Sequence, residues 1–94
     1  MVKHIVVYTL KANVDKTAAV KLIASLLEPL VGQIPGLTHM EVRRVFQGKM
    51  DYALYSEFES ADALAAYAVH PLHLKAKEQF FDMIDTRVSA DYEV

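Results

Sequence analysis

The stretch Tyr67-Ala68-Val69-His70-Pro71-Leu72-His73 decides how this chain is organised, because it interrupts a helical pattern and carries two of the four histidines. Proline cannot comfortably continue the helix before it, but it suits the first turn of a new one. His70 then stands at the N-cap of that new helix. We therefore predict two short helices that meet at Pro71, and we expect the residues at their junction to form the lip of a pocket.

Outward from this junction, apolar periodicity predicts three strands and a further, longer helix on the N-terminal side and one strand on the C-terminal side. The predicted strands are Val2–Leu10, Leu37–Phe46, Tyr52–Phe58 and Met83–Tyr92, the last with Ile84, Thr86, Val88, Ala90 and Tyr92 on one face. Asp15 is the expected N-cap of a long helix with a wide apolar stripe, and Pro29 is expected to kink or end it. Ser60 caps the alanine-rich helix before the junction.

The order strand, helix, strand, strand, helix pair, strand is the split βαβ or ferredoxin-like arrangement of an α+β domain. We expect residues 1–94 to form one domain, with a four-stranded antiparallel sheet and the helices on one face only. The other face carries Ile5, Val7, Ala53 and Tyr55. Because this face is too apolar to remain in water, we predict a homodimer that packs sheet against sheet as a dimeric α+β barrel.

Composition excludes several classes of function. The chain has no cysteine, which rules out disulfides, thiolate zinc sites and cysteine nucleophiles. A net charge of −2 with interspersed signs argues against nucleic acid as a partner. The sequence shows neither a membrane-spanning apolar run nor a secretory signal, so we expect a cytoplasmic protein. We find no glycine-rich phosphate loop and no nucleophile elbow.

The chain resembles the stress-responsive α/β-barrel family, called Dabb, over essentially its whole length. The resemblance rests on the opening Val2–Val6, on the passage Asp51–Ser60, and on Tyr67, His70, Pro71 and His73 in one run. It implies a dimer with a pocket between sheet and helices. Some plant members are polyketide cyclases that close poly-β-ketoacyl thioesters by aldol chemistry without a cofactor.

The same resemblance implies that Tyr67 and His73 are the catalytic pair of such a cyclase and that His4 is a pocket histidine. Where the plant cyclases have a further pocket histidine on the third strand, this chain has Tyr52. Chemically, His73 suits a general base near neutral pH, and Tyr67 can donate a hydrogen bond to a developing enolate.

We count His4, Tyr52 and His70 as candidate ligand-binding residues. Each candidate also has a structural alternative. His73 can be a half-exposed helix residue, and Tyr67 and Tyr52 can be core aromatics. His4 can be a histidine at a strand end with both ring nitrogens hydrogen-bonded, and His70 can be a helix cap. The histidines lack the spacing of a helical metal-ligand pair, and we expect no metal and no cofactor.

Three functions remain open. The first is a cofactor-independent enzyme that holds a small apolar ketone or phenolic ligand in a cavity; the predicted lining is Leu10, Leu22, Leu26, Leu54, Phe58, Leu64 and Phe80. The second is a non-catalytic stress-response or structural dimer. The third is a relative of the ferredoxin-like monooxygenases. A roomy cavity that touches His4, Tyr67 and His73 favours the first, and a fully packed core favours the second.

Overall fold

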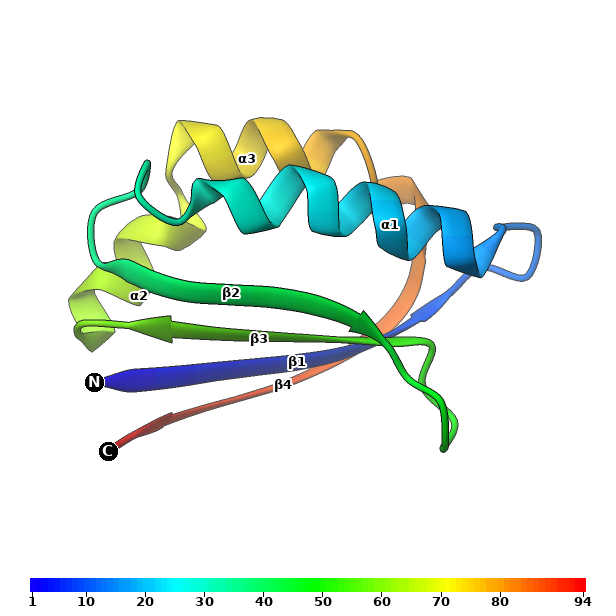
Figure 1. The fold of residues 1–94 in the computed structure, drawn as a ribbon, viewed down its shortest axis with the longest axis horizontal. Helices are drawn as coiled ribbons and strands as arrows, with labels where there is room; N and C mark the ends of the chain where they lie inside the picture. The colour runs from blue at the N-terminus through cyan, green and yellow to red at the C-terminus, as the bar shows by residue number, and fades with distance from the viewer.

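A computed structural model describes all residues of the chain, Met1–Val94. Three helices lie over one face of a four-stranded sheet, and the two chain ends lie close together at one end of it (Figure 1). The elements are β1 (Val2–Leu10), α1 (Lys16–Leu27), β2 (Leu37–Arg44), β3 (Tyr52–Phe58), α2 (Ala61–Ala68), α3 (Pro71–Glu78) and β4 (Ile84–Glu93), with short 3₁₀ turns at Glu28–Leu30 and Phe81–Met83. The predicted ferredoxin-like α+β fold is confirmed.

The strand order in the sheet is β2-β3-β1-β4, and every neighbouring pair is antiparallel. The side chains of β1 that face the helices are buried, as in Val6 and Tyr8. In contrast, no residue of β4 is buried, and Ile84 alone is partly shielded. The helices therefore cover β2, β3 and β1 and leave the inner face of the edge strand β4 open to solvent.

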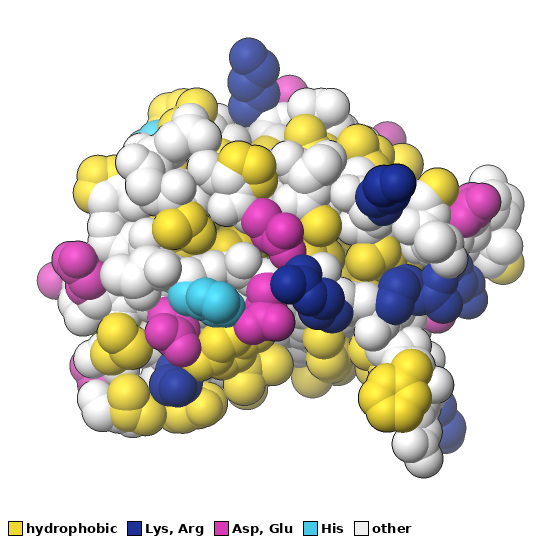
Figure 2. Space-filling view, in the orientation of Figure 1, with side chains coloured by type: hydrophobic (Ala, Val, Ile, Leu, Met, Phe, Trp, Pro, Cys, Tyr) yellow, Lys and Arg dark blue, Asp and Glu magenta, His cyan; other side chains and the backbone are white.

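Two local predictions about the strands were wrong. β2 ends at Arg44, and Phe46 lies on the connection to β3 with 98% of its surface exposed instead of facing the core. Figure 2 shows hydrophobic atoms on this projecting connection. In β4, a register shift opposite Thr9 and Leu10 pairs Ile84 with Leu10. Because of this irregularity, Ile84 faces the helices and not the side of the sheet that carries Thr86.

The first helix begins and ends where the sequence indicates. The Asp15 carboxylate accepts a hydrogen bond from the Ala18 backbone N–H at 3.0 Å, and the α-helix stops before Pro29. Glu28, at this end, accepts hydrogen bonds from the backbone N–H of Val42 at 3.0 Å and from Arg43 at 2.7 Å. A side chain thus satisfies a backbone donor on the outer edge of β2, where no further strand is available.

The junction of α2 and α3 forms as predicted. His70 has extended backbone angles, φ −67° and ψ 135°, and its Nδ1 accepts a hydrogen bond from the Leu72 backbone N–H at 3.1 Å. Pro71 is the first residue of α3, where the missing N–H costs nothing. The break between the helices is therefore built from a histidine cap and a proline.

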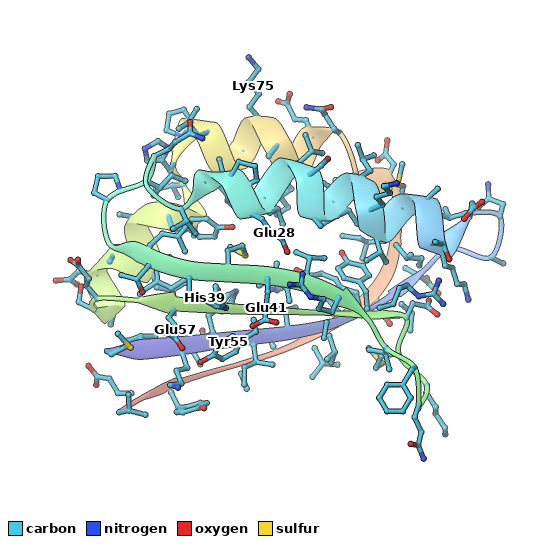
Figure 3. The ribbon with its side chains drawn as sticks, in the orientation of Figure 1. Glu28, His39, Glu41, Tyr55, Glu57 and Lys75 are labelled. Atoms are coloured by element: carbon cyan, nitrogen blue, oxygen red, sulfur yellow. The ribbon has the colours of Figure 1, made fainter.

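The side of the sheet away from the helices carries both apolar and charged groups. Its apolar part is on β1 and β4, where Val88 and Tyr92 are 62% and 47% exposed. On β2 and β3, His39, Glu41, Tyr55 and Glu57 lie beside one another (Figure 3). His39 contacts Glu41 at 2.9 Å. None of the helices is long and apolar enough to cross a membrane.

Candidate functional site

A cavity of about 290 Å³ lies between the sheet and the pair α2 and α3, with walls from β1, β3 and β4. Its apolar lining includes Leu54, Leu64 and Phe80, as predicted. The other four predicted lining residues, Leu10, Leu22, Leu26 and Phe58, lie outside it, and Leu27, Phe81 and Ile84 contribute instead. Its polar lining consists of His4, Tyr8, Tyr67, His73, Lys77 and Arg87.

Tyr67 and His73 lie side by side in this cavity. Their ring centroids are 4.2 Å apart with planes inclined by 33°. Tyr67 is 4% exposed and packs on Phe58 at a centroid distance of 5.1 Å. Burial raises the pKa of the Tyr67 phenol well above its ordinary value. The phenol is therefore a neutral hydrogen-bond donor at neutral pH.

The His73 ring has a defined hydrogen-bonding state. Its Nδ1 donates to the backbone carbonyl oxygen of Ala68 at 3.3 Å, since that oxygen can only accept. In the neutral ring the other nitrogen, Nε2, then has the free lone pair. Burial lowers the pKa of His73, and the positive charge of Lys77 acts in the same direction. The hydrogen bond to Ala68 opposes this shift only in part, so His73 stays neutral and available as a base.

His4 reaches the same cavity from β1. It pairs in register with Asp91 on β4, and its Nδ1 forms a hydrogen bond with the Asp91 carboxylate. The ring also packs edge-on against Phe58 at 6.3 Å. A carboxylate that accepts from Nδ1 fixes the tautomer and leaves Nε2 without a proton in the neutral ring.

The cavity contains three polar residues that the sequence analysis missed: Tyr8, Lys77 and Arg87. The Arg87 guanidinium carbon lies 6.0 Å from the centroid of the Tyr8 ring. Burial raises the pKa of Tyr8, while the charge of Arg87 lowers it. Lys77 could have been found, because it follows His73 by four residues and so shares its helix face. Arg87 and Asp91 could not, since their places depend on the register of β4 against β1.

Tyr52 and His70 do not line the cavity. Tyr52 is fully buried and stacks on Tyr8, with centroids 4.4 Å apart and planes inclined by 12°. Its hydroxyl has no hydrogen-bond partner, and burial raises its pKa far above that of a free phenol. His70 caps α3. The structure thus brings His4, Tyr67 and His73 together and places these two elsewhere.

No group of three or more histidine, aspartate or glutamate side chains is arranged to hold a metal ion.

Residues 2–94 match the model of the stress-responsive A/B barrel domain. The chain belongs to the Dabb family. A dimeric protein of unknown function and ferredoxin-like fold from Bacteroides fragilis is 31% identical, with a TM-score of 0.90 and coverage of 99% of this chain and 95% of that one. A Dabb family protein from Mesorhizobium loti is 24% identical, with a TM-score of 0.79 and coverage of 99% and 95%.

The fold also occurs in an enzyme. A hydroxynitrile lyase from Passiflora edulis is 18% identical, with a TM-score of 0.81 and coverage of 97% of this chain and 90% of that one. At this identity the likeness shows the fold alone. No curated protein sequence matches the chain.

Proposed function

We propose that this Dabb protein catalyses a cofactor-independent, aldol-type ring closure of a small diketone held in the cavity. The observation that carries the proposal is the pairing of a neutral histidine, with Nε2 free, and a neutral buried phenol in one apolar chamber. Apolar pockets with a few convergent polar groups are typical ligand sites, and about 290 Å³ lies at the small end of their range.

In the proposed reaction, Nε2 of His73 takes a proton from the carbon beside a ketone, and the remaining electron pair forms an enolate. The Tyr67 hydroxyl donates a hydrogen bond to the enolate oxygen, where charge develops. The enolate carbon then bonds to the carbon of the second carbonyl group, whose oxygen becomes an alkoxide. The His73 imidazolium returns its proton to this alkoxide, so that the base is regenerated without any cofactor.

His4 has a positioning role in this proposal. The Asp91 carboxylate accepts from Nδ1 and holds the ring in place, so Nε2 can accept a hydrogen bond from the hydroxyl group that forms at the second carbonyl. The first ketone would lie next to Tyr67 and His73 and the second next to His4, since all three residues line one cavity.

The test uses 2,6-heptanedione, whose intramolecular aldol closure and loss of water give a conjugated enone with a strong ultraviolet absorbance. His73→Asn is expected to lower the rate by roughly 10²- to 10⁴-fold, and Tyr67→Phe by at least tenfold. His39→Asn is the matched control, because His39 lies on the opposite face of the sheet. Wild-type melting temperature should be nearly retained in all three variants.

A His73→Asn variant with the wild-type rate would contradict the proposal. Failure of the wild-type protein to accelerate ring closure would favour the alternative, a non-catalytic protein whose relevant property is its dimer.

We also propose a homodimer through the sheet face that the helices leave bare. Its support is the exposed apolar surface of Val88 and Tyr92 and the dimeric state of the relative from Bacteroides fragilis. Val88→Lys is expected to give monomers in analytical ultracentrifugation, whereas Ser89→Lys, on the opposite face of β4, should leave the dimer intact. Two dimeric variants would contradict this interface. The cysteine-free composition supports a cytoplasmic location, which is likewise a proposal.

A further inference from the structure

The fixed charges on the cavity wall are all positive. Lys77 comes from α3 and Arg87 from β4, and no carboxylate lines the cavity. Asp91 lies behind His4 and is already bound to it. The chain forms five close pairs between basic and acidic side chains, and neither Lys77 nor Arg87 takes part in any of them.

Both cations are held against aromatic rings at the mouth of the cavity. The Arg87 guanidinium carbon lies 6.0 Å from the Tyr8 ring centroid, and the Lys77 ammonium lies 5.4 Å from that of Phe81. Arg87 is opposite Tyr8 in the β1–β4 register and projects toward the helices from the edge strand that no helix covers. A ligand that enters along β4 therefore meets Arg87 before it reaches Tyr67 and His73.

We infer that the ligand of this cavity is a small diketone that also carries a carboxylate, and that this carboxylate binds Arg87 at the mouth while one ketone lies beside Tyr67 and His73. This inference rests on the proposed function and names its substrate class. The planar guanidinium offers two parallel N–H donors that match a carboxylate. Lys77, on the opposite wall, adds a second positive charge. The apolar wall between these groups accommodates the carbon chain or ring that joins the two ends of the ligand.

The probe is 3-benzoylpropionate, a stable keto acid with one aromatic ring, compared with its primary amide, which keeps the shape and removes the charge. Both are titrated into ¹⁵N-labelled protein at pH 8, where the carboxylate is ionised and imidazole is ordinarily neutral. We expect the acid to bind about tenfold or more tightly than the amide, the ratio typical of one charge-assisted pair.

Arg87→Met should lower this ratio several-fold, because it weakens the binding of the acid and leaves the binding of the amide unchanged; Lys77 accounts for any preference that remains. Arg87→Lys keeps the positive charge but loses the two parallel N–H donors, so it should retain part of the preference for the acid. Lys75→Met is the matched control, because Lys75 lies on the same helix as Lys77 but points away from the sheet and does not line the cavity (Figure 3). It removes the same charge without touching the cavity and should leave the ratio unchanged. The ¹H–¹⁵N spectrum of each protein variant verifies that the variant is folded.

Equal binding of acid and amide to the wild-type protein would overturn the inference and leave the proposed ketone site intact. A ratio in Arg87→Met equal to that in Lys75→Met would overturn it as well. If neither compound binds, the cavity is not a ketone site, and the proposed function falls together with this inference.

Discussion

Gly36 fixes the distance between the start of β2 and helix α2, and its replacement by alanine is expected to be strongly destabilising. Its φ of +85° is a conformation that an alanine adopts at a cost of about 1–2 kcal/mol. A Cβ at this position would lie 2.5 Å from the Cβ of Ala63, which is far inside van der Waals contact. Such overlap costs about 1–3 kcal/mol more. We therefore expect Gly36→Ala to lower the free energy of unfolding by roughly 2–5 kcal/mol.

The chain offers a matched control for each of the two contributions. Gly32 has a similar φ of +90°, but a Cβ there meets no atom within 4 Å, so Gly32→Ala should show the backbone cost alone. In an Ala63→Gly background, the overlap at Gly36 disappears. Gly36→Ala should then cost no more than Gly32→Ala does.

Urea unfolding followed by circular dichroism, at one fixed protein concentration because subunit association would add to stability, gives all of these free energies. Equal costs for Gly36→Ala and Gly32→Ala would refute the reasoning. So would a Gly36→Ala cost that is unchanged by Ala63→Gly, since this would show that α2 is not the group that the new methyl meets.

Three further predictions concern single side chains. Tyr52→Phe removes a buried hydroxyl without a partner, so urea unfolding should show no loss of stability and a gain of up to about 1–2 kcal/mol; a loss beyond 1 kcal/mol would mean that the hydroxyl is bonded. Asp15→Ala should cost about 1 kcal/mol because α1 loses its cap, and a cost near zero would contradict that assignment. Burial lowers the pKa of His73, so the folded state binds fewer protons there than the unfolded chain, and stability should fall as pH drops from about 6.5 toward the lowered value. His73→Asn should flatten this slope, and an NMR titration that places His73 above 6.5 would refute it.

The fold was predictable because the local signals agree with one another. Asp15, Pro29, Ser60 and the pair His70-Pro71 punctuate the chain at the places where elements begin and end, and each acts through its own backbone neighbours. The exception is Phe46, whose apolar side chain indicated a longer strand. The hairpin connection begins before it, and no neighbouring element covers its ring.

The site was only partly predictable, because several of its residues are brought together by the register of β4 against β1. Tyr67 and His73 belong to one short stretch, so a local pattern could identify them. Arg87 and Asp91 acquire their roles from their partners Tyr8 and His4 across the β1–β4 ladder, and a shift by one residue would turn both side chains to the other face of the sheet. The irregularity that turns Ile84 into the cavity has no signature in the sequence.

The break at Pro71 also explains why Tyr67 and His73 can work together. In one continuous helix, two residues six positions apart differ by about 120° around the axis and about 9 Å along it, so their rings could not meet. Here α2 ends at Ala68, and the extended backbone of His70 redirects the chain before α3 begins. The freed carbonyl oxygen of Ala68 then accepts the Nδ1 proton of His73, and the two rings come to 4.2 Å. The helix end thus supplies the hydrogen bond that fixes the tautomer of the histidine, and the same interruption that shapes the fold leaves Nε2 available for chemistry.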